Sequence, residues 1–155
     1  MPDIQSTLKL SALALLLLIL SLPSMINAGE AIDYAKGFRD MEWGASLSDW
    51  ENLLQKSKNK IRPFKGYDRT GENLNWEGIT AKSITYGFRR GKFGGLNIGF
   101  ADKDVAAVLD AFSEKFGKPK KTNLFIMTNY EWHTDDLDIS LISSKKGASI
   151  NIKPK

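Results

Sequence analysis

The chain has 155 residues, no cysteine and a formal net charge of +4 at pH 7. The absence of cysteine excludes thiol catalysis, disulfide exchange and thiolate metal sites, and it leaves apolar burial to stabilise the fold. A charge this mild permits attraction to anionic surfaces without requiring it. Nucleic-acid-binding proteins are usually more basic and carry a recognisable module. This sequence contains none, so nucleic-acid binding is not expected.

The N-terminal residues have the pattern of a secretory signal peptide. Lys9 precedes a run of 13 residues, Leu10 to Leu22, that is apolar except for Ser11 and Ser21, and a small residue, Ala28, follows. A membrane-spanning helix needs about 20 residues. We therefore predict a signal peptide at residues 1–28, cleaved after Ala28, and no transmembrane span after processing. A retained N-terminal anchor is the alternative because Asp3 weakens the positive start, whereas a lipid anchor is excluded because no cysteine follows the run.

Residues 29–155 are expected to fold as one domain, since that length suffices for one core and not for two. A short extended segment should stop at Gly44. Ser46 then occupies a helix N-cap position, and Asp49 follows where an acid favours the positive helix end. With no histidine nearby in sequence, capping accounts for Ser46 and Asp49 better than catalysis does. Apolar residues at helical spacing predict a first amphipathic helix: Leu47, Trp50, Leu53 and Leu54.

A basic segment follows this expected helix. Its Pro63 and Gly66 disfavour a long regular element, so we predict a surface loop. It carries five positive charges with no acid among them: Lys56, Lys58, Lys60, Arg62 and Lys65. These residues are the candidate contact to anionic lipid headgroups, lipopolysaccharide or an acidic partner, since each basic residue near a charged membrane contributes about 1 kcal/mol. The alternative is a solvated surface that only maintains solubility.

The clearest β pattern is a hairpin whose turn lies at residues 89–92. Apolar side chains alternate along both of its strands: Ile84, Tyr86, Phe88, Leu96, Ile98 and Phe100. Gly87 and Gly99 fall on the opposite face, where a bulky group can pack closely. Gly94 and Gly95 suggest a β-bulge.

A second amphipathic helix is predicted from Asp102, its expected cap, to Phe116. Gly117 followed by Pro119 ends it. Its apolar stripe comprises Val105, Val108, Leu109, Phe112 and Phe116.

Three β segments complete the chain, at residues 125–133, 137–143 and 148–152. Alternation of polar and apolar residues in the second implies a sheet with one wet face. The whole pattern predicts an α+β fold, in which two amphipathic helices pack on one face of a meandering, mainly antiparallel sheet. The order of elements looks like two loose copies of one unit, although no residue-level repeat supports this.

The best catalytic candidate surrounds the one histidine of the chain. Glu131, His133 and Asp135 alternate, so on one strand they would share a face and could bind a metal or hold a general base. One histidine is poor for zinc, which prefers several nitrogen or sulfur ligands. The favoured interpretation therefore has Trp132 pointing inward and its neighbours in water, with no catalytic, cofactor-binding or metal-binding residue.

The four tryptophans raise the question of a sugar-stacking site. Trp43, Trp50 and Trp132 occupy strand-like or helical apolar positions and are expected in the core. Trp76 lies in the least regular region, where it could be exposed. One aromatic side chain is weak support for a carbohydrate site.

Three motifs support a resemblance to a group of known proteins. "FRDMEWGASLSDWENLL", "ITYGFRRGKFGGLNIGF" and "LDAFSEKFGKP" resemble segments of small exported bacterial proteins of uncharacterised function. More distantly, the layout is similar to small envelope modules of the β-barrel assembly lipoprotein type and the β-lactamase-inhibitor-protein type, which bind other proteins. The chain lacks the lipidation cysteine of the first type and the disulfides of the second.

The predicted function is that of a non-enzymatic module, periplasmic or secreted, that binds an envelope protein or an anionic envelope component without a cofactor. The alternative is a hydrolase or metal-dependent enzyme centred on Glu131, His133 and Asp135.

Overall fold

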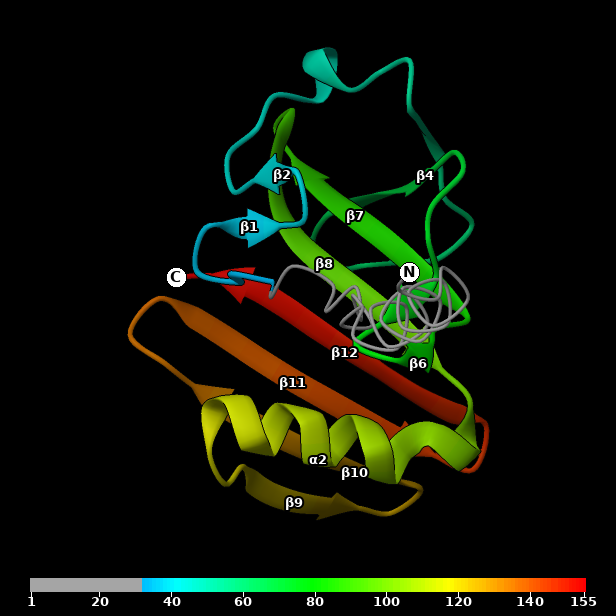
Figure 1. Ribbon diagram of the computed structural model, residues 1–155, viewed down its shortest axis with the longest axis vertical. Coiled ribbons are helices and arrows are strands. Elements are labelled where there is room, and N and C mark those ends of the chain that lie inside the picture. The colour runs from blue at the N-terminus through cyan, green and yellow to red at the C-terminus, as the bar shows by residue number, and fades with distance from the viewer. Residues whose placement is uncertain (1–31) are drawn as a thin grey trace, which may run out of the picture. The chain divides into compact units, whose positions relative to one another are not determined.

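An eight-stranded antiparallel sheet organises residues 32–155, which are the residues that the computed structural model describes (Figure 1). The predicted signal peptide, residues 1–28, lies outside them. In spatial order the strands are β3 (Leu54–Lys56), β4 (Lys65–Arg69), β7 (Ser83–Arg89), β8 (Lys92–Phe100), β12 (Gly147–Pro154), β11 (Leu137–Ser144), β10 (Met127–His133) and β9 (Lys120–Leu124). Two small hairpins lie outside this sheet: β1 (Gly37–Phe38) with β2 (Met41–Glu42), and β5 (Asn75–Trp76) with β6 (Ile79–Thr80).

The sheet consists of two four-stranded meanders. β3, β4, β7 and β8 follow one another in the first, and β9 to β12 run in reverse order in the second, so that β8 pairs with β12. Each half of the sheet is thus a four-stranded meander, but the unit of helix and strands that the order of elements suggested is not repeated. The helices do not repeat.

The expectation of two helices on the sheet is wrong, because the described residues contain one α-helix, α2 (Val105–Phe116). Strands take up 49% of the described residues and helices 15%. Where the first helix was predicted, the chain forms a 3₁₀ turn, η1 (Leu47–Asp49), and then enters β3. Ser46 stands before that turn in an extended conformation, but its side chain makes no capping hydrogen bond.

A short amphipathic run gains little as an isolated helix, because nucleating the first turn is unfavourable. Here the competing structure is the sheet: Leu54 pairs with Arg69 and Lys56 with Tyr67. Leu53, counted as part of the apolar stripe, is 43% exposed. Backbone pairing with β4 has thus replaced the second half of the expected helix.

The second predicted helix is present. A 3₁₀ turn, η2 (Asp102–Asp104), precedes α2, and Gly117 ends it with a φ of 82°. The cap positions are Ala101 for η2 and Asp104 for α2, so the expected role of Asp102 as the cap is wrong. None of the helices within residues 32–155 is long and apolar enough to cross a membrane.

The core lies on one face of the sheet. Both strands of the predicted hairpin bury their alternating apolar residues there, and β11 and β12 do the same. Figure 1 shows α2 in front of the half of the sheet that contains β10 and β11, and the ring of Phe112 lies 5.6 Å from that of Trp132. The β1–β2 hairpin covers the other half, where the ring of Phe38 packs edge-on against that of Tyr86 with the ring centroids 6.0 Å apart. The opposite face of the sheet carries the polar side chains.

Candidate functional site

A continuous row of polar side chains crosses the face of the sheet opposite to α2. Each member is the registered partner of the next on the neighbouring strand, in the order Gln55, Asp68, Thr85, Asn97, Asn151, Ser140, Glu131 and Lys120. Asn97 donates a 2.8 Å hydrogen bond to Asn151, and Thr85 donates a 3.0 Å bond to Asp68. The polar face expected from alternation in β11 therefore extends over all eight strands, although Thr85 in β7 is buried.

The loop at residues 57–64 folds over part of this face. Ile61 and Phe64 occupy space that three glycines leave free, because Gly66, Gly87 and Gly95 place no Cβ beneath them. A Cβ at Gly87 would lie 2.9 Å from Cβ of Phe64. The close packing expected over Gly87 is thus present.

The β-bulge expected at Gly94 and Gly95 is also present. Gly87 pairs with Gly95, whereas the next residue, Phe88, pairs with Phe93, so that Gly94 is the extra residue. A Cβ at Gly94 would lie 3.2 Å from the ring of Phe64.

The loop and the sheet enclose a hollow of about 380 Å³, which we call the Arg62 pocket. This volume falls in the range of small-molecule sites. One wall comes from the loop and the other from the ends of β10, β11 and β12. The main lining side chains are Ile61, Arg62, Phe64, Glu131, His133, Asp138, Ser140, Asn151 and Lys153.

Two charged contacts fix the sheet side of the Arg62 pocket. Nδ1 of His133 lies 3.0 Å from Oδ1 of Asp138, and Nζ of Lys153 lies 3.8 Å from Oδ2 of the same residue. The hydrogen bond with His133, aided by the charge of Lys153, holds the pKa of Asp138 below its usual value. The ionised form of Asp138 is thus favoured, and its contact with the imidazole links β11 to β10 at the wall of the pocket.

The predicted catalytic trio is only partly assembled. Glu131 and His133 share a face, as expected, and both line the Arg62 pocket. Asp135 lies in the exposed turn after β10 and does not line it. Asp138, from the next strand, stands beside the histidine instead. Among residues 32–155, no three histidine, aspartate or glutamate side chains come together in a group that could hold a metal ion.

Nucleophilic catalysis would need a further contact at this site. Ser140 lines the same pocket, but within the described part of the chain no hydrogen bond joins it to His133, whose side chain is 60% exposed. A Ser-His-Asp site is recognised by a hydrogen bond between nucleophile and base. The described residues therefore do not form an assembled Ser-His-Asp site.

The basic residues of the predicted loop are all exposed: Lys56, Lys58, Lys60, Arg62 and Lys65. Lys56 and Lys65 lie in β3 and β4, so the loop is shorter than expected. Arg62 differs from the others because it lines the pocket. Sequence reasoning grouped these residues by charge alone and missed that Ile61 and Phe64 fix the segment on the sheet.

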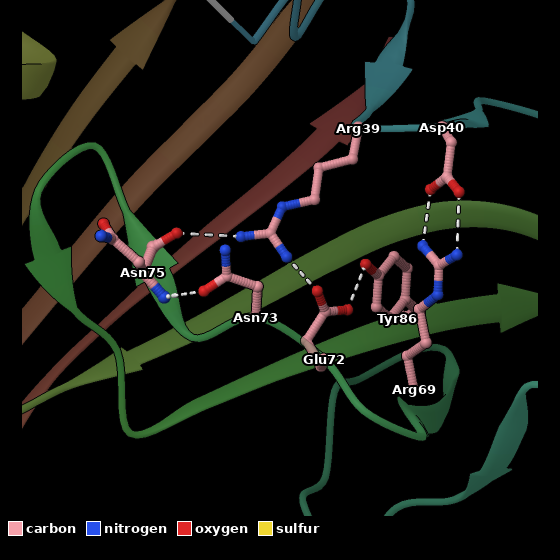
Figure 2. Close-up of polar contacts among 7 residues, drawn as sticks. All are labelled: Arg39, Asp40, Arg69, Glu72, Asn73, Asn75 and Tyr86. Carbon is pink, nitrogen blue, oxygen red and sulfur yellow. Dashed lines mark hydrogen bonds and ion pairs between the residues drawn. The ribbon is translucent and has the colours of Figure 1, made fainter. Parts of the chain in front are cut away.

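A second polar cluster lies at the other side of the fold (Figure 2). The side chain of Glu72 is only 9% exposed, and it accepts hydrogen bonds from Arg39 and from the hydroxyl of Tyr86, the latter at 2.6 Å. Nη2 of Arg39 also donates a 3.0 Å bond to the backbone oxygen of Asn75. Burial, together with the bond to Glu72, raises the pKa of Tyr86. These contacts fasten the β1–β2 turn to β7, so we assign the cluster to stability.

An ion pair continues this cluster. Arg69 donates two hydrogen bonds, of 2.6 and 2.8 Å, to the two carboxylate oxygens of Asp40. The guanidinium also lies over the ring of Trp50, 5.1 Å from its centroid. The bonds from Arg69 hold the pKa of Asp40 below its usual value.

No exposed sugar-stacking tryptophan is found among residues 32–155. Trp76 is 1% exposed and Trp132 is 3% exposed, while Trp43 and Trp50 are half-buried against the core. The expectation that Trp76 could be exposed is wrong, because the β5–β6 hairpin carries it onto Phe100 and Phe112.

Comparison of the chain with protein-family models, with curated proteins and with solved structures finds no match. The Arg62 pocket is therefore interpreted from its own geometry.

Proposed function

We propose that this protein is a non-enzymatic exported module that binds a protein or another envelope component through the Arg62 pocket. The observation that carries this proposal is the chemistry of the pocket walls. Arg62 is exposed and makes no ion pair within residues 32–155. The ring of Phe64 stands beside it, and Lys153 faces it from β12. Because Lys153 is already paired with Asp138, and Glu131 adds a second carboxylate to the opposite wall, Arg62 is the group that would hold a ligand carboxylate or phosphate, with Ile61 and Phe64 as its apolar neighbours.

Two further features support binding rather than turnover. The N-terminal sequence has the pattern of a leader for export. In an oxidising compartment outside the cytoplasm, a fold without cysteine is not altered by disulfide formation. Two pairs in the polar row, Thr85 with Asp68 and Asn97 with Asn151, are joined by hydrogen bonds, so this part of the surface is pre-formed. Pre-formed surfaces lower the entropic cost of association.

Site-directed photo-crosslinking in an envelope fraction of the source organism tests the proposal. A benzophenone side chain replaces Ser140 in the pocket or, as a matched control, Ala106 on the exposed side of α2. We expect a discrete adduct from position 140 and not from position 106. The adduct should be lost in Arg62→Gln and kept in Lys58→Gln, since Lys58 does not line the pocket. Equal labelling at both positions would contradict binding through the pocket.

A hydrolase remains the second candidate, because His133 and Asp138 form a contact of 3.0 Å in a hollow that also contains Ser140. Its test is turnover of activated ester, phosphoester and peptide substrates by the wild-type protein. Turnover that disappears in His133→Gln and persists in Asp135→Asn would establish an enzyme and overturn the binding proposal.

A further inference from the structure

The hairpin between β9 and β10 ends in an exposed apolar tip. Leu124 is 50% exposed, Phe125 107% and Ile126 72%. Five large apolar side chains within residues 32–155 are exposed, and three of them are consecutive here. Contiguous exposed apolar side chains mark contact surfaces, whereas single ones are ordinary.

Turn formation does not account for these side chains. Leu124 pairs with Met127, so Phe125 and Ile126 are the two central residues of the turn. Two-residue hairpins favour asparagine, aspartate and glycine at these positions. Neither residue adopts a positive φ, and neither contributes to the buried core. Their apolar surface is therefore available to something outside the described chain.

Lysines stand beside this tip. Met127 pairs with Ser144, which places the next turn, with exposed Lys145 and Lys146, alongside it. Figure 1 shows both turns at the same end of the sheet. An open hollow of about 740 Å³ lies between the two turns, and Asp102 is the one acidic residue that lines it.

The edge strand next to the tip disfavours a second copy as the occupant. All five residues of β9 are exposed, and Lys120 and Lys121 lie on this edge. Lysines on an edge strand oppose pairing with another strand, because two copies would bring like charges together.

We propose that the Leu124–Ile126 tip inserts into the surface of an anionic phospholipid bilayer, with Lys145 and Lys146 over the lipid phosphates. Shallow insertion of apolar side chains beside basic ones is how peripheral proteins hold charged membranes. This site is separate from the Arg62 pocket, since Met127 and His133 lie at opposite ends of β10. Loss of one function therefore leaves the other intact.

A vesicle flotation assay tests this proposal. The assay uses the protein purified from its host after any natural processing. We expect binding to vesicles with phosphatidylglycerol and much weaker binding to phosphatidylcholine alone. Phe125→Ser with Ile126→Ser should weaken binding about tenfold or more, because partial burial of one large apolar side chain contributes on that order. Lys145→Gln with Lys146→Gln should weaken binding and reduce its dependence on salt. The matched control, Arg89→Gln with Lys92→Gln, removes two exposed positive charges at the far end of the β7–β8 hairpin and should bind as the wild type does.

The absence of native cysteine permits a second readout. An environment-sensitive dye on Phe125→Cys should shift to the blue and brighten with anionic vesicles, whereas the same dye on Leu53→Cys, an exposed apolar position outside the tip, should not. The proposal is overturned if the protein does not bind these vesicles, or if the control pair abolishes binding and the tip pair does not. A tip pair that alters only the oligomeric state in solution would also overturn it.

Discussion

Phe64 lies directly over Gly95: a Cβ on this glycine would stand 2.8 Å from Cε2 of the phenylalanine ring. We therefore predict that Gly95→Ala lowers the free energy of unfolding by about 1–3 kcal/mol, as overpacked substitutions do. Urea denaturation followed by circular dichroism measures this effect. The same substitution should also widen the Arg62 pocket, because the ring that forms one of its walls must move.

A double-mutant cycle provides the control for Gly95→Ala. In a Phe64→Ala background the new methyl group meets no ring, so the substitution should cost much less than it does in the wild type. Equal costs in the two backgrounds would show that Phe64 does not occupy this space.

The buried hydroxyl of Tyr86 gives a second prediction. It donates a 2.6 Å hydrogen bond to Glu72, whose other carboxylate oxygen is held by Arg39. Tyr86→Phe should lower the free energy of unfolding by about 1–3 kcal/mol, since it removes a charge-assisted bond in a desolvated site. Tyr130→Phe is the matched control, because that hydroxyl makes no hydrogen bond within residues 32–155 and its removal should cost little. Similar costs at the two positions would argue against a stabilising role for the cluster.

The elements that could be predicted from the sequence are those whose pattern is local. The β7–β8 hairpin follows from alternation on both sides of Gly91, which only the bulge at Gly94 interrupts, and α2 follows from a stripe of five apolar residues with a glycine stop. In each case the apolar face that the local pattern predicts is the face that packs against the core. Local preference and tertiary structure coincide there.

The prediction of the first helix was wrong because the interaction that decides the structure there, pairing with β4, joins residues that are distant in sequence. Leu47, Trp50 and Leu54 have helical spacing, but the backbone oxygen of Leu53 accepts a hydrogen bond from Thr70, and residues 54–56 pair with β4. A run this short cannot offset such pairing by helix propensity alone.

Only part of the candidate site could be predicted, because the rest depends on contacts between residues that are distant in sequence. Alternation placed Glu131 and His133 on one face, and antiparallel return after the Asp135–Asp136 turn pairs His133 with Asp138. The sequence therefore contained the signal for Asp138, although it was not used. The position of Arg62 depends on Phe64 meeting glycines of two other strands, and no local pattern records that contact.

The indole of Trp76 provides a third prediction. Its Nε1 donates a 2.5 Å hydrogen bond to the hydroxyl of Tyr34, and its ring stacks on Phe112 with the centroids 5.1 Å apart. Trp76→Phe should lower the free energy of unfolding by about 1–3 kcal/mol, because it leaves a cavity and an unpaired hydroxyl. Thermal denaturation measures the loss. Trp50→Phe, at a half-buried site, should cost less, and the opposite order would contradict the core position of Trp76.

The ion pair between Asp40 and Arg69 predicts a dependence on pH. The hydrogen bonds from Arg69 hold the pKa of Asp40 below its ordinary value of 3.8. A carboxyl group with a lowered pKa in the folded state stabilises the fold above its unfolded pKa, and this contribution is lost as the pH falls through the folded value. Asp40→Asn should therefore lower the thermal midpoint at pH 6, by a free energy under about 1 kcal/mol because the carboxylate is half exposed.

The difference between wild type and Asp40→Asn should shrink as the pH falls below about 4, since the wild-type carboxyl group then becomes protonated as well. Thermal midpoints of both proteins between pH 6 and pH 2.5 measure this convergence. Asp135→Asn is the control, because Asp135 lies in an exposed turn and forms no ion pair within residues 32–155. Its difference from wild type should stay near zero throughout. A gap for Asp40→Asn that persists unchanged to pH 2.5 would show that packing or hydrogen bonding, and not the charge of Asp40, produces the effect.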